Sequence, residues 1–178
     1  TVLFVTLDRE EALPLSPRIA VMARGKALQV ASPNDLYNRL VSVEVADFSG
    51  QMNFVEAQVI DGRNGEAVLD TGGLGKITAP ANSDFVHKDA AIIVAIRPEK
   101  LLLSAERWPE SQAAVQGTLK TSAYLGDRNH FYVSVDGCEK PLAVAATEAE
   151  VSGGQPLDHE STVWLSWADN ALILLPRD

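Results

Sequence analysis

The sequence predicts a mainly β protein in which a short α/β segment precedes one or more small β-barrels. From Phe54 onward, short apolar and β-branched runs alternate with turn signals such as DGRNG, DTGG, LGDRN and DGCEK, and no helical stretch lies between them. Strands at this spacing indicate a small barrel or sandwich, and the recurring order of strand, bend and strand suggests two related halves. Before Asn53 the pattern is mixed α and β, so we expect a linker near residues 50–55.

The N-terminal segment opens with a strand that leads into a helix. The apolar run Val2–Val5 is typical of a buried strand, and the acidic residues that follow predict a helix from Asp8 to about Leu13. The next elements are expected in this order: strands at residues 18–23 and 26–30, a helix at 33–40 with Ser32 as its N-cap, and a second short helix that ends before Gly50.

The remaining residues predict strands only. We expect them at residues 54–60, 66–70, 75–79, 90–96, 100–104, 113–124, 130–135, 141–145, 162–167 and 171–175.

Composition and charge narrow the function classes. The chain has 178 residues, of which 46% are apolar and 22% charged, and this balance suits a packed core. The net charge is −9 and no segment gathers Lys and Arg into a stripe, so nucleic acid is not expected as a partner. The single cysteine, Cys138, excludes an internal disulfide and a multi-thiolate metal site. No apolar run approaches the ~20 residues that cross a bilayer, so the chain itself is expected to be soluble.

Leu7 lies at the junction between the opening strand and its helix. Ligands bind at strand-to-helix junctions of α/β sheets, because the carboxyl ends of strands and the N-termini of helices both point there. A leucine can do no polar chemistry at such a place. Asp8, Glu10 and Glu11 could act as paired carboxylates in acid–base catalysis, but the helix dipole also favours negative charge in a first turn, and we favour that explanation.

The glycine-rich stretch DTGGLGKIT predicts a hairpin turn and not a phosphate-binding loop. Such a loop needs a glycine five positions before Gly75, where the chain has Asp70. It also needs Ser or Thr after Lys76, where the chain has Ile77. The spacing therefore excludes the phosphate loop here.

Histidines and tryptophans give no further site. His87, His130 and His159 lack the i, i+4 spacing that places two imidazoles on one metal, so we expect them at the surface and predict no metal ligands. Trp164 and Trp167 lie three residues apart, so on a strand they face opposite sides and cannot form one stacking platform for bases.

The sequence resembles a known family in several blocks. VTLDREEAL, SPRIAVMARGKALQVASPNDLY and VADFSGQMNF are similar to the C-terminal end of the ATP-binding subunit of an ABC importer, in the branch of polyamine, iron and maltose-type importers. AIRPEKLLL, YLGDRNHFYV and VWLSWADNALILL are similar to the appended TOBE domain, an OB-like barrel. The resemblance implies that residues 1–52 are a remnant of the ATPase domain and that residues 53–178 are a TOBE regulatory and dimerisation domain.

The resemblance also implies what the chain lacks. In the family a switch histidine that contacts the γ-phosphate of ATP follows the first strand, and its place here is taken by Leu7. The phosphate loop, signature motif and catalytic glutamate of the family lie upstream and do not occur in these residues. We therefore expect no catalytic, cofactor-binding or metal-binding residue in this fragment, which should be inactive alone, whereas the intact subunit would bind ATP and Mg.

The implied partners follow from the same resemblance. They are a second copy bound through the TOBE domain, membrane permease subunits and, indirectly, a solute-binding protein, with the subunit on the cytoplasmic face of the cell membrane. Two alternatives remain: a free-standing module that binds a small ligand or oxyanion, and, disfavoured by charge, an oligonucleotide-binding barrel.

The opening strand raises a question of its own. A run as apolar as Val2–Val5 belongs inside a parallel sheet, yet its partner strands are missing. An exposed strand edge invites pairing with another chain. We expect residues 1 to about 31 either to be disordered or to be exchanged between two copies.

Overall fold

The chain folds into two compact units, Thr1–Gln51 and Met52–Asp178, which are described separately. The structure is a computed structural model, and it describes residues 2–63, 65–81, 83–108, 113–124, 126, 128–147, 150–151 and 157–177.

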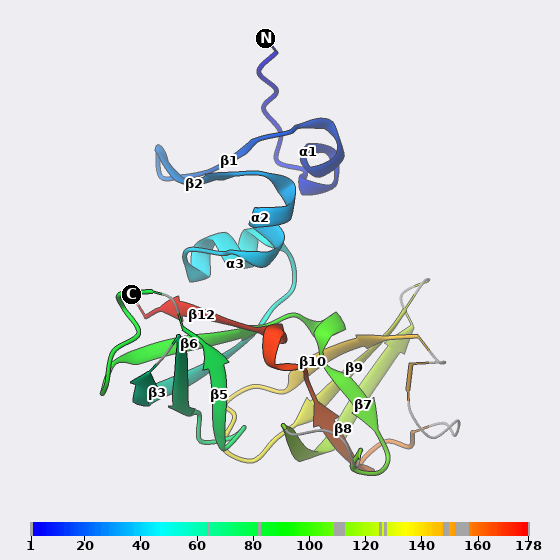
Figure 1. The fold of residues 1–178 in the computed structure, drawn as a ribbon. Coiled ribbons are helices and arrows are strands. Elements are labelled where there is room, and N and C mark those ends of the chain that lie inside the picture. The colour runs from blue at the N-terminus through cyan, green and yellow to red at the C-terminus, as the bar shows by residue number, and fades with distance from the viewer. Residues whose placement is uncertain are drawn as a thin grey trace. The chain divides into compact units, whose positions relative to one another are not determined.

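The N-terminal unit consists of short helices around one hairpin (Figure 1). Its elements are α1 (Arg9–Leu15), β1 (Ile19–Ala23), β2 (Lys26–Ala31), α2 (Pro33–Asn38) and α3 (Val43–Ser49). Each helix begins where a side chain accepts a hydrogen bond from the first turn: Asp8 caps α1, Ser32 caps α2 and Ser42 caps α3. The hairpin turns at Arg24 and Gly25, which both have positive φ angles. These elements lie where the sequence predicted them.

The predicted opening strand does not form. Val2–Val5 pairs with no strand among the described residues, and its side chains are largely exposed, from 52% at Phe4 to 92% at Val2. A strand is stabilised by hydrogen bonds to a neighbour, and the described residues supply none for this segment. The expectation of a buried strand was therefore wrong for this chain taken alone.

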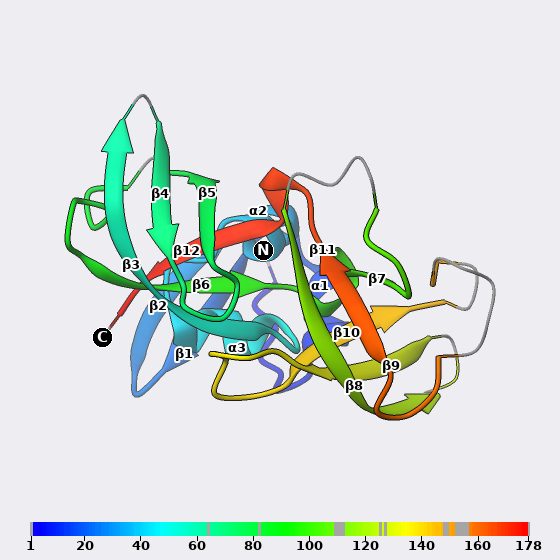
Figure 2. The ribbon, with the colours of Figure 1, turned by 90° about the horizontal axis from the view of Figure 1, so that it is seen from below.

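The C-terminal unit is built from two five-stranded antiparallel sheets. The first has the order β12-β6-β3-β4-β5, with β3 (Asn53–Arg63), β4 (Glu66–Asp70), β5 (Lys76–Pro80), β6 (Ala91–Ile96) and β12 (Leu172–Pro176). The second has the order β10-β9-β8-β11-β7, with β7 (Leu102–Ser104), β8 (Ala114–Tyr124), β9 (Asn129–Ser134), β10 (Leu142–Ala146) and β11 (Thr162–Ser166). Figure 2 shows that both sheets curl strongly. The predicted mainly β fold is confirmed, and it consists of two half-barrels.

The two half-barrels repeat one another in detail. The long strands β3 and β8 each carry a bulge, between Val59 and Asp61 in β3 and between Leu119 and Thr121 in β8. In each half, a residue with a positive φ angle donates a backbone hydrogen bond to the strand residue just before the bulge. The Asp89 N–H donates to the Val59 carbonyl, and the Glu160 N–H donates to the Leu119 carbonyl. This internal repeat confirms the interpretation of two related halves.

Each half-barrel borrows its fifth strand from the other half of the sequence. After β6 the chain passes through the 3-10 turn η1 (Pro98–Lys100) and enters the second sheet as β7. After β11 it passes through η2 (Asp169–Ala171) and returns to the first sheet as β12 (Figure 2). The crossed strands interlock the halves, so that one hydrophobic core spans both sheets.

The tryptophans separate as the strand geometry requires. Trp167 is only 6% exposed and packs in the core, whereas Trp164 lies on the other face of the sheet, where the Arg107 guanidinium stands over its ring at 5.7 Å from the centroid.

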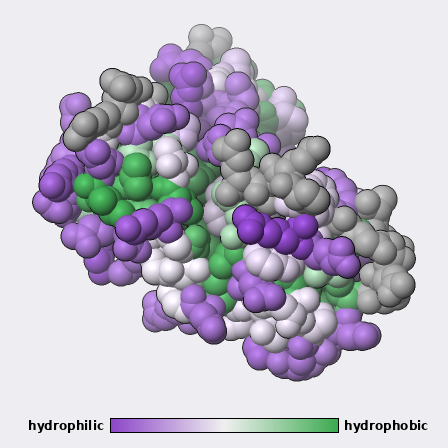
Figure 3. Space-filling view, turned by 60° about the horizontal axis from the view of Figure 1, so that its bottom comes forward, coloured by the Kyte–Doolittle hydropathy of each residue, from purple (hydrophilic) through white to green (hydrophobic). Residues whose placement is uncertain are grey.

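Hydrophilic residues cover much of the face drawn in Figure 3, with hydrophobic residues in limited areas between them.

Candidate functional site

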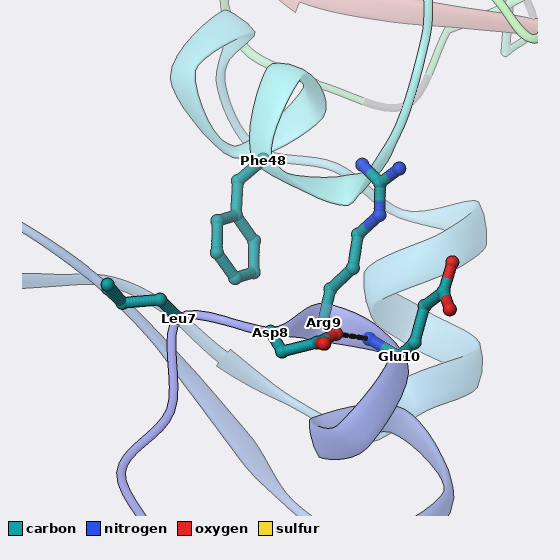
Figure 4. Close-up of a pocket in the computed structure, with 5 residues that line it drawn as sticks. All are labelled: Leu7, Asp8, Arg9, Glu10 and Phe48. Atoms are coloured by element: carbon teal, nitrogen blue, oxygen red, sulfur yellow. Dashed lines mark hydrogen bonds between the residues drawn. The ribbon is translucent and has the colours of Figure 1, made fainter.

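Leu7, which the sequence analysis singled out, lines an open hollow in the N-terminal unit. Leu7, Asp8, Arg9 and Glu10 line it from the start of α1, and Phe48 lines it from α3 (Figure 4). The hollow measures about 560 Å³. Leu7 is fully exposed and Phe48 is 40% exposed. The ring of Phe48 points toward the segment of Leu7 and Asp8, while the carboxylate of Glu10 points away from the ring.

Hydrogen bonds fix the backbone on both sides of Leu7. The Thr6 hydroxyl accepts from the Asp8 N–H and donates to the Glu11 carboxylate, each at 2.9 Å. Asp8 Oδ1 accepts from the Glu10 N–H at 2.7 Å and from the Glu11 N–H at 3.4 Å. Asp8 is therefore the N-cap of α1, which supports the structural explanation of this acidic group over an acid–base pair.

The hollow offers little chemistry of its own. Among its described lining residues, the Arg9 guanidinium is the side-chain group able to bind an anion, and the backbone N–H groups of Glu10 and Glu11 at the start of α1 already bond Asp8. Leu7 supplies no group that could bond a phosphate or orient water. Within the part of the chain that is described, no cluster of three or more His, Cys, Asp or Glu is arranged to hold a metal ion.

The three histidines do not meet. His87 and His159 are exposed, while His130 lies half-buried on β9 with a shielded Nδ1 that has no hydrogen-bond partner among the described residues. The expectation of a surface position thus holds for two of them.

Burial raises the pKa of the Cys138 thiol, so at neutral pH this cysteine stays protonated.

A second, smaller hollow lies at the bulge of β8. Leu119, Thr121, Ser122 and His159 line about 180 Å³ there. Beside it, Lys120 Nζ contacts the Glu160 carboxylate at 2.9 Å. The hydrogen bond from Lys120 holds the pKa of Glu160 below its usual value of 4.5. The hollow thus combines two hydroxyls and one imidazole next to a neutral ion pair, and the sequence did not predict it.

Two polar residues, Asn53 and Arg97, are buried in the interior, and the sequence did not predict their burial. Asn53 is 5% exposed and Arg97 is 4% exposed. Nδ2 and Oδ1 of Asn53 bond the carbonyl and the N–H of Ala143, 90 residues away in sequence. An asparagine at the edge of an apolar run is typical of a turn, so the local pattern carries no signal of this contact.

Comparison with known proteins identifies the C-terminal region. Residues 94–175 match the TOBE domain family. The chain is 40% identical over 141 residues to the spermidine/putrescine import ATP-binding protein PotA of Mesorhizobium japonicum, a match that covers 78% of this chain and 36% of that protein. It is 30% identical over 177 residues to PotA of Thermobifida fusca, covering 99% of this chain and 45% of the relative.

Relatives named for another solute match almost as well. The Fe(3+) ions import ATP-binding protein FbpC of Brucella abortus is 36% identical over 136 residues, which covers 76% of this chain and 36% of FbpC. The chain thus spans between 36% and 45% of the length of these three relatives.

A solved structure supports the fold. The cytoplasmic molybdate-binding protein ModG, crystallised with molybdate bound, superposes with a TM-score of 0.57 at 15% identity, covering 70% of this chain and 96% of ModG. No helix in the described ranges has both the length and the apolar character needed to cross a membrane. Residues 94–175 therefore match the TOBE domain family, and the chain is similar to the C-terminal region of the ATP-binding subunits of ABC importers.

Proposed function

We propose that this chain is the C-terminal regulatory and dimerisation part of the ATP-binding subunit of an ABC importer. The observation that carries the proposal is the match to PotA of Thermobifida fusca, which extends over 99% of the chain and so includes the N-terminal unit as well as the barrels. The solute we favour is a polyamine, because the relatives named for spermidine and putrescine reach 40% identity and cover 78% of the chain.

In this proposal the N-terminal unit is the end of an ATPase domain. ATP and Mg are bound upstream of Thr1, the subunit pairs with a second copy through the TOBE domain, and it acts on permease subunits at the cytoplasmic face of the membrane. Leu7 occupies the position of the switch histidine. The fixed backbone around Leu7, with Thr6 and Asp8 hydrogen-bonded on either side, supports a position that presents its side chain outward.

Two observations test the importer proposal. The coding sequence upstream of Thr1 should continue in the same reading frame with a phosphate loop and a signature motif. The chain by itself should not bind a fluorescent ATP analogue in an anisotropy titration. A stop codon directly upstream, or saturable binding of the analogue to this chain, would contradict the proposal.

The hollow at the bulge of β8 favours a second candidate, a module that binds a small oxyanion. Thr121 and Ser122 offer hydroxyl donors, and the imidazole of His159 would add a ring N–H donor. The likeness to ModG concerns the fold only, and its bound molybdate suggests which anion to try first. Calorimetric titration with molybdate, sulfate and phosphate separates the candidates. Binding that a Thr121→Val variant loses would support the oxyanion module, and no heat with any anion would exclude it.

A further inference from the structure

The side chain of Asn53 lies where a neighbouring strand would lie along the free edge of β10. β10 is the last strand of its sheet, and its only strand neighbour among the described residues is β9. Asn53 Nδ2 donates to the Ala143 carbonyl oxygen at 2.8 Å, and Asn53 Oδ1 accepts from the Ala143 N–H at 2.7 Å. One carboxamide therefore makes both hydrogen bonds that one residue of an antiparallel strand would receive.

The edge needs this partner because it is buried. All five residues of β10 are buried, and a buried N–H or C=O without a partner is costly. Along an antiparallel strand every second residue turns its backbone groups away from the neighbour. The next such residue after Ala143 is Ala145, and Arg128 Nη1 reaches its carbonyl oxygen at 3.5 Å. Side chains, rather than a strand, close the edge of β10.

The internal repeat shows that the fold does not require the contact. The registers place Thr78 of the edge strand β5 at the position that Ala143 holds in β10, since Thr78 pairs with Val68 as Ala143 pairs with Tyr132. Asn53 lies six residues before the Val59 bulge, and Ala113 lies six residues before the Leu119 bulge, so the two correspond. The methyl side chain of Ala113 can make no hydrogen bond to a strand edge. The carboxamide contact is thus a feature of one half-barrel only.

The position of Asn53 in the chain gives the contact its significance. α3 ends at Ser49 and β3 begins at Asn53, so three residues separate them. The four Cα–Cα steps from Ser49 to Asn53 extend over about 14 Å at most. A displacement of α3 that exceeds this reach must pull on Asn53, which is bonded to the half-barrel that lies later in the sequence.

We propose that Asn53 is a latch that couples the linker to the second half-barrel. When the Asn53 carboxamide is bonded to Ala143, both backbone groups of Ala143 have a partner at the edge of β10. When the linker pulls Asn53 away, these two hydrogen bonds break. The device lies within the C-terminal unit and does not depend on the importer function. It would give movements of the N-terminal unit a direct mechanical effect on the TOBE domain.

Amide hydrogen exchange of the full chain tests the latch. Asn53→Ala should raise exchange at the Ala143 N–H by about tenfold or more, because a buried hydrogen bond is lost, while amides of β6 keep their rates. Asn53→Asp, which keeps an acceptor but loses the donor, should raise it less. Gln58→Ala, which removes an exposed amide from the same strand, is the matched control. Unchanged protection of Ala143 in both Asn53 variants would overturn the proposal.

A change of linker length separates a latch from a merely structural contact. Deleting Gln51 shortens the linker by about 3.5 Å and should raise exchange at Ala143 in the parent chain. The same deletion should have no further effect in the Asn53→Ala background, because the coupled group is gone. Insertion of Gly-Ser after Gln51 should leave Ala143 protected. If the deletion leaves Ala143 unaffected, or acts equally in both backgrounds, Asn53 is no latch.

Discussion

The side chain of Leu7 makes no packing contact with the described residues that would account for a leucine at this position. It is fully exposed, and the hydrogen bonds of Thr6 and Asp8 fix the backbone around it without using its side chain. Packing therefore does not explain a leucine at this position. The proposed role as the replacement of a switch histidine remains a prediction, and it leads to a direct experiment.

In the intact subunit of the proposed importer, Leu7→His should raise ATP turnover. A residue that bonds the transferred phosphate in the transition state is typically worth ~100- to 1000-fold in rate. Phosphate release at saturating ATP measures the gain, and the thermal stability of this chain should not change. Leu15→His, at a second exposed leucine at the opposite end of α1, is the control and should leave turnover as it is. Equal turnover in the parent and Leu7→His would mean that the site is organised differently.

Glu160 makes a prediction about acid stability. The hydrogen bond from Lys120 holds the pKa of Glu160 below its usual value of 4.5, so the folded state binds this proton less tightly than the unfolded state does. The contribution of the pair is therefore complete above pH 4.5 and is lost as the pH falls through the lower folded-state pKa. Thermal melts of the parent and Glu160→Gln should differ at pH 6 and converge toward pH 3.

Salt and a second glutamate serve as controls for that prediction. The pair is exposed, so 0.5 M NaCl should also reduce the difference between parent and variant. Glu66→Gln on β4 removes an exposed carboxylate and should change the melts little at either pH. A difference between parent and Glu160→Gln that persists at pH 3 would contradict the assignment.

At the residue scale, the sequence predicts contacts that follow from local chemistry and misses those that depend on distant parts. The cap at Ser32 was readable because a capping side chain bonds a backbone group three residues away. The hollow at Thr121 and the carboxamide of Asn53 were not readable. The bonded partner of Asn53 is 90 residues away, and no local pattern records it.

At the scale of elements, Gly117 shows where two strands come too close for a side chain. A Cβ placed at Gly117 on β8 would lie 2.6 Å from Val133 Cγ1 and 2.7 Å from the Ser134 carbonyl oxygen. Gly117→Ala should therefore lower the free energy of unfolding by about 1–3 kcal/mol, as overpacked cores do. Urea denaturation measures the loss.

Gly62 provides the matched control for the glycine experiment. It lies on β3, the counterpart of β8, and a Cβ there would meet its nearest atoms at 3.9 Å and 4.0 Å, which is ordinary contact. Gly62→Ala should thus change stability far less than Gly117→Ala. Equal losses in both variants would show that the close approach at Gly117 is relieved by a small shift of β9.

Strand positions were predictable, but strand partners were not. The strand predicted at residues 66–70 matches β4 residue for residue. Its side chains alternate between buried and exposed positions, and the sequence shows this as an alternation of apolar and polar residues. A strand was predicted to start at Lys100, but β7 starts two residues later, at Leu102. The reason is that Pro98 opens a 3-10 turn that includes Lys100. That β7 and β12 would exchange between halves was not predictable, because pairing depends on surfaces formed only after folding.

At the scale of the whole molecule, the exchange of strands predicts an unexpected effect of truncation. β12 pairs with β6 in the first sheet, so removing residues 172–178 takes a strand from the half-barrel that lies earliest in the sequence. Hydrogen exchange should rise in β3, β4 and β6 more than in β8 and β9. The reverse pattern would contradict the described strand order.

The apolar N-terminal residues predict a change of mass if two copies exchange them. Val2–Val5 is exposed and has no partner strand in the described part of the chain. Removal of residues 1–15 should then convert a dimer into a monomer, as measured by light scattering after size exclusion. An oligomer that is unchanged by the deletion would count against exchange, and dimerisation would have to reside in the TOBE domain.

The crossed strands also constrain the order of events during synthesis. β3 to β6 leave the ribosome before the strands of the second half-barrel, yet the sheet that they form is completed by β12, which follows all of those strands. The earlier half-barrel must therefore wait, incomplete and with the edge of β6 open, until the later one has been made. We expect this domain to fold late and as one unit, so a nascent chain stalled before Leu172 would be a natural client for chaperones.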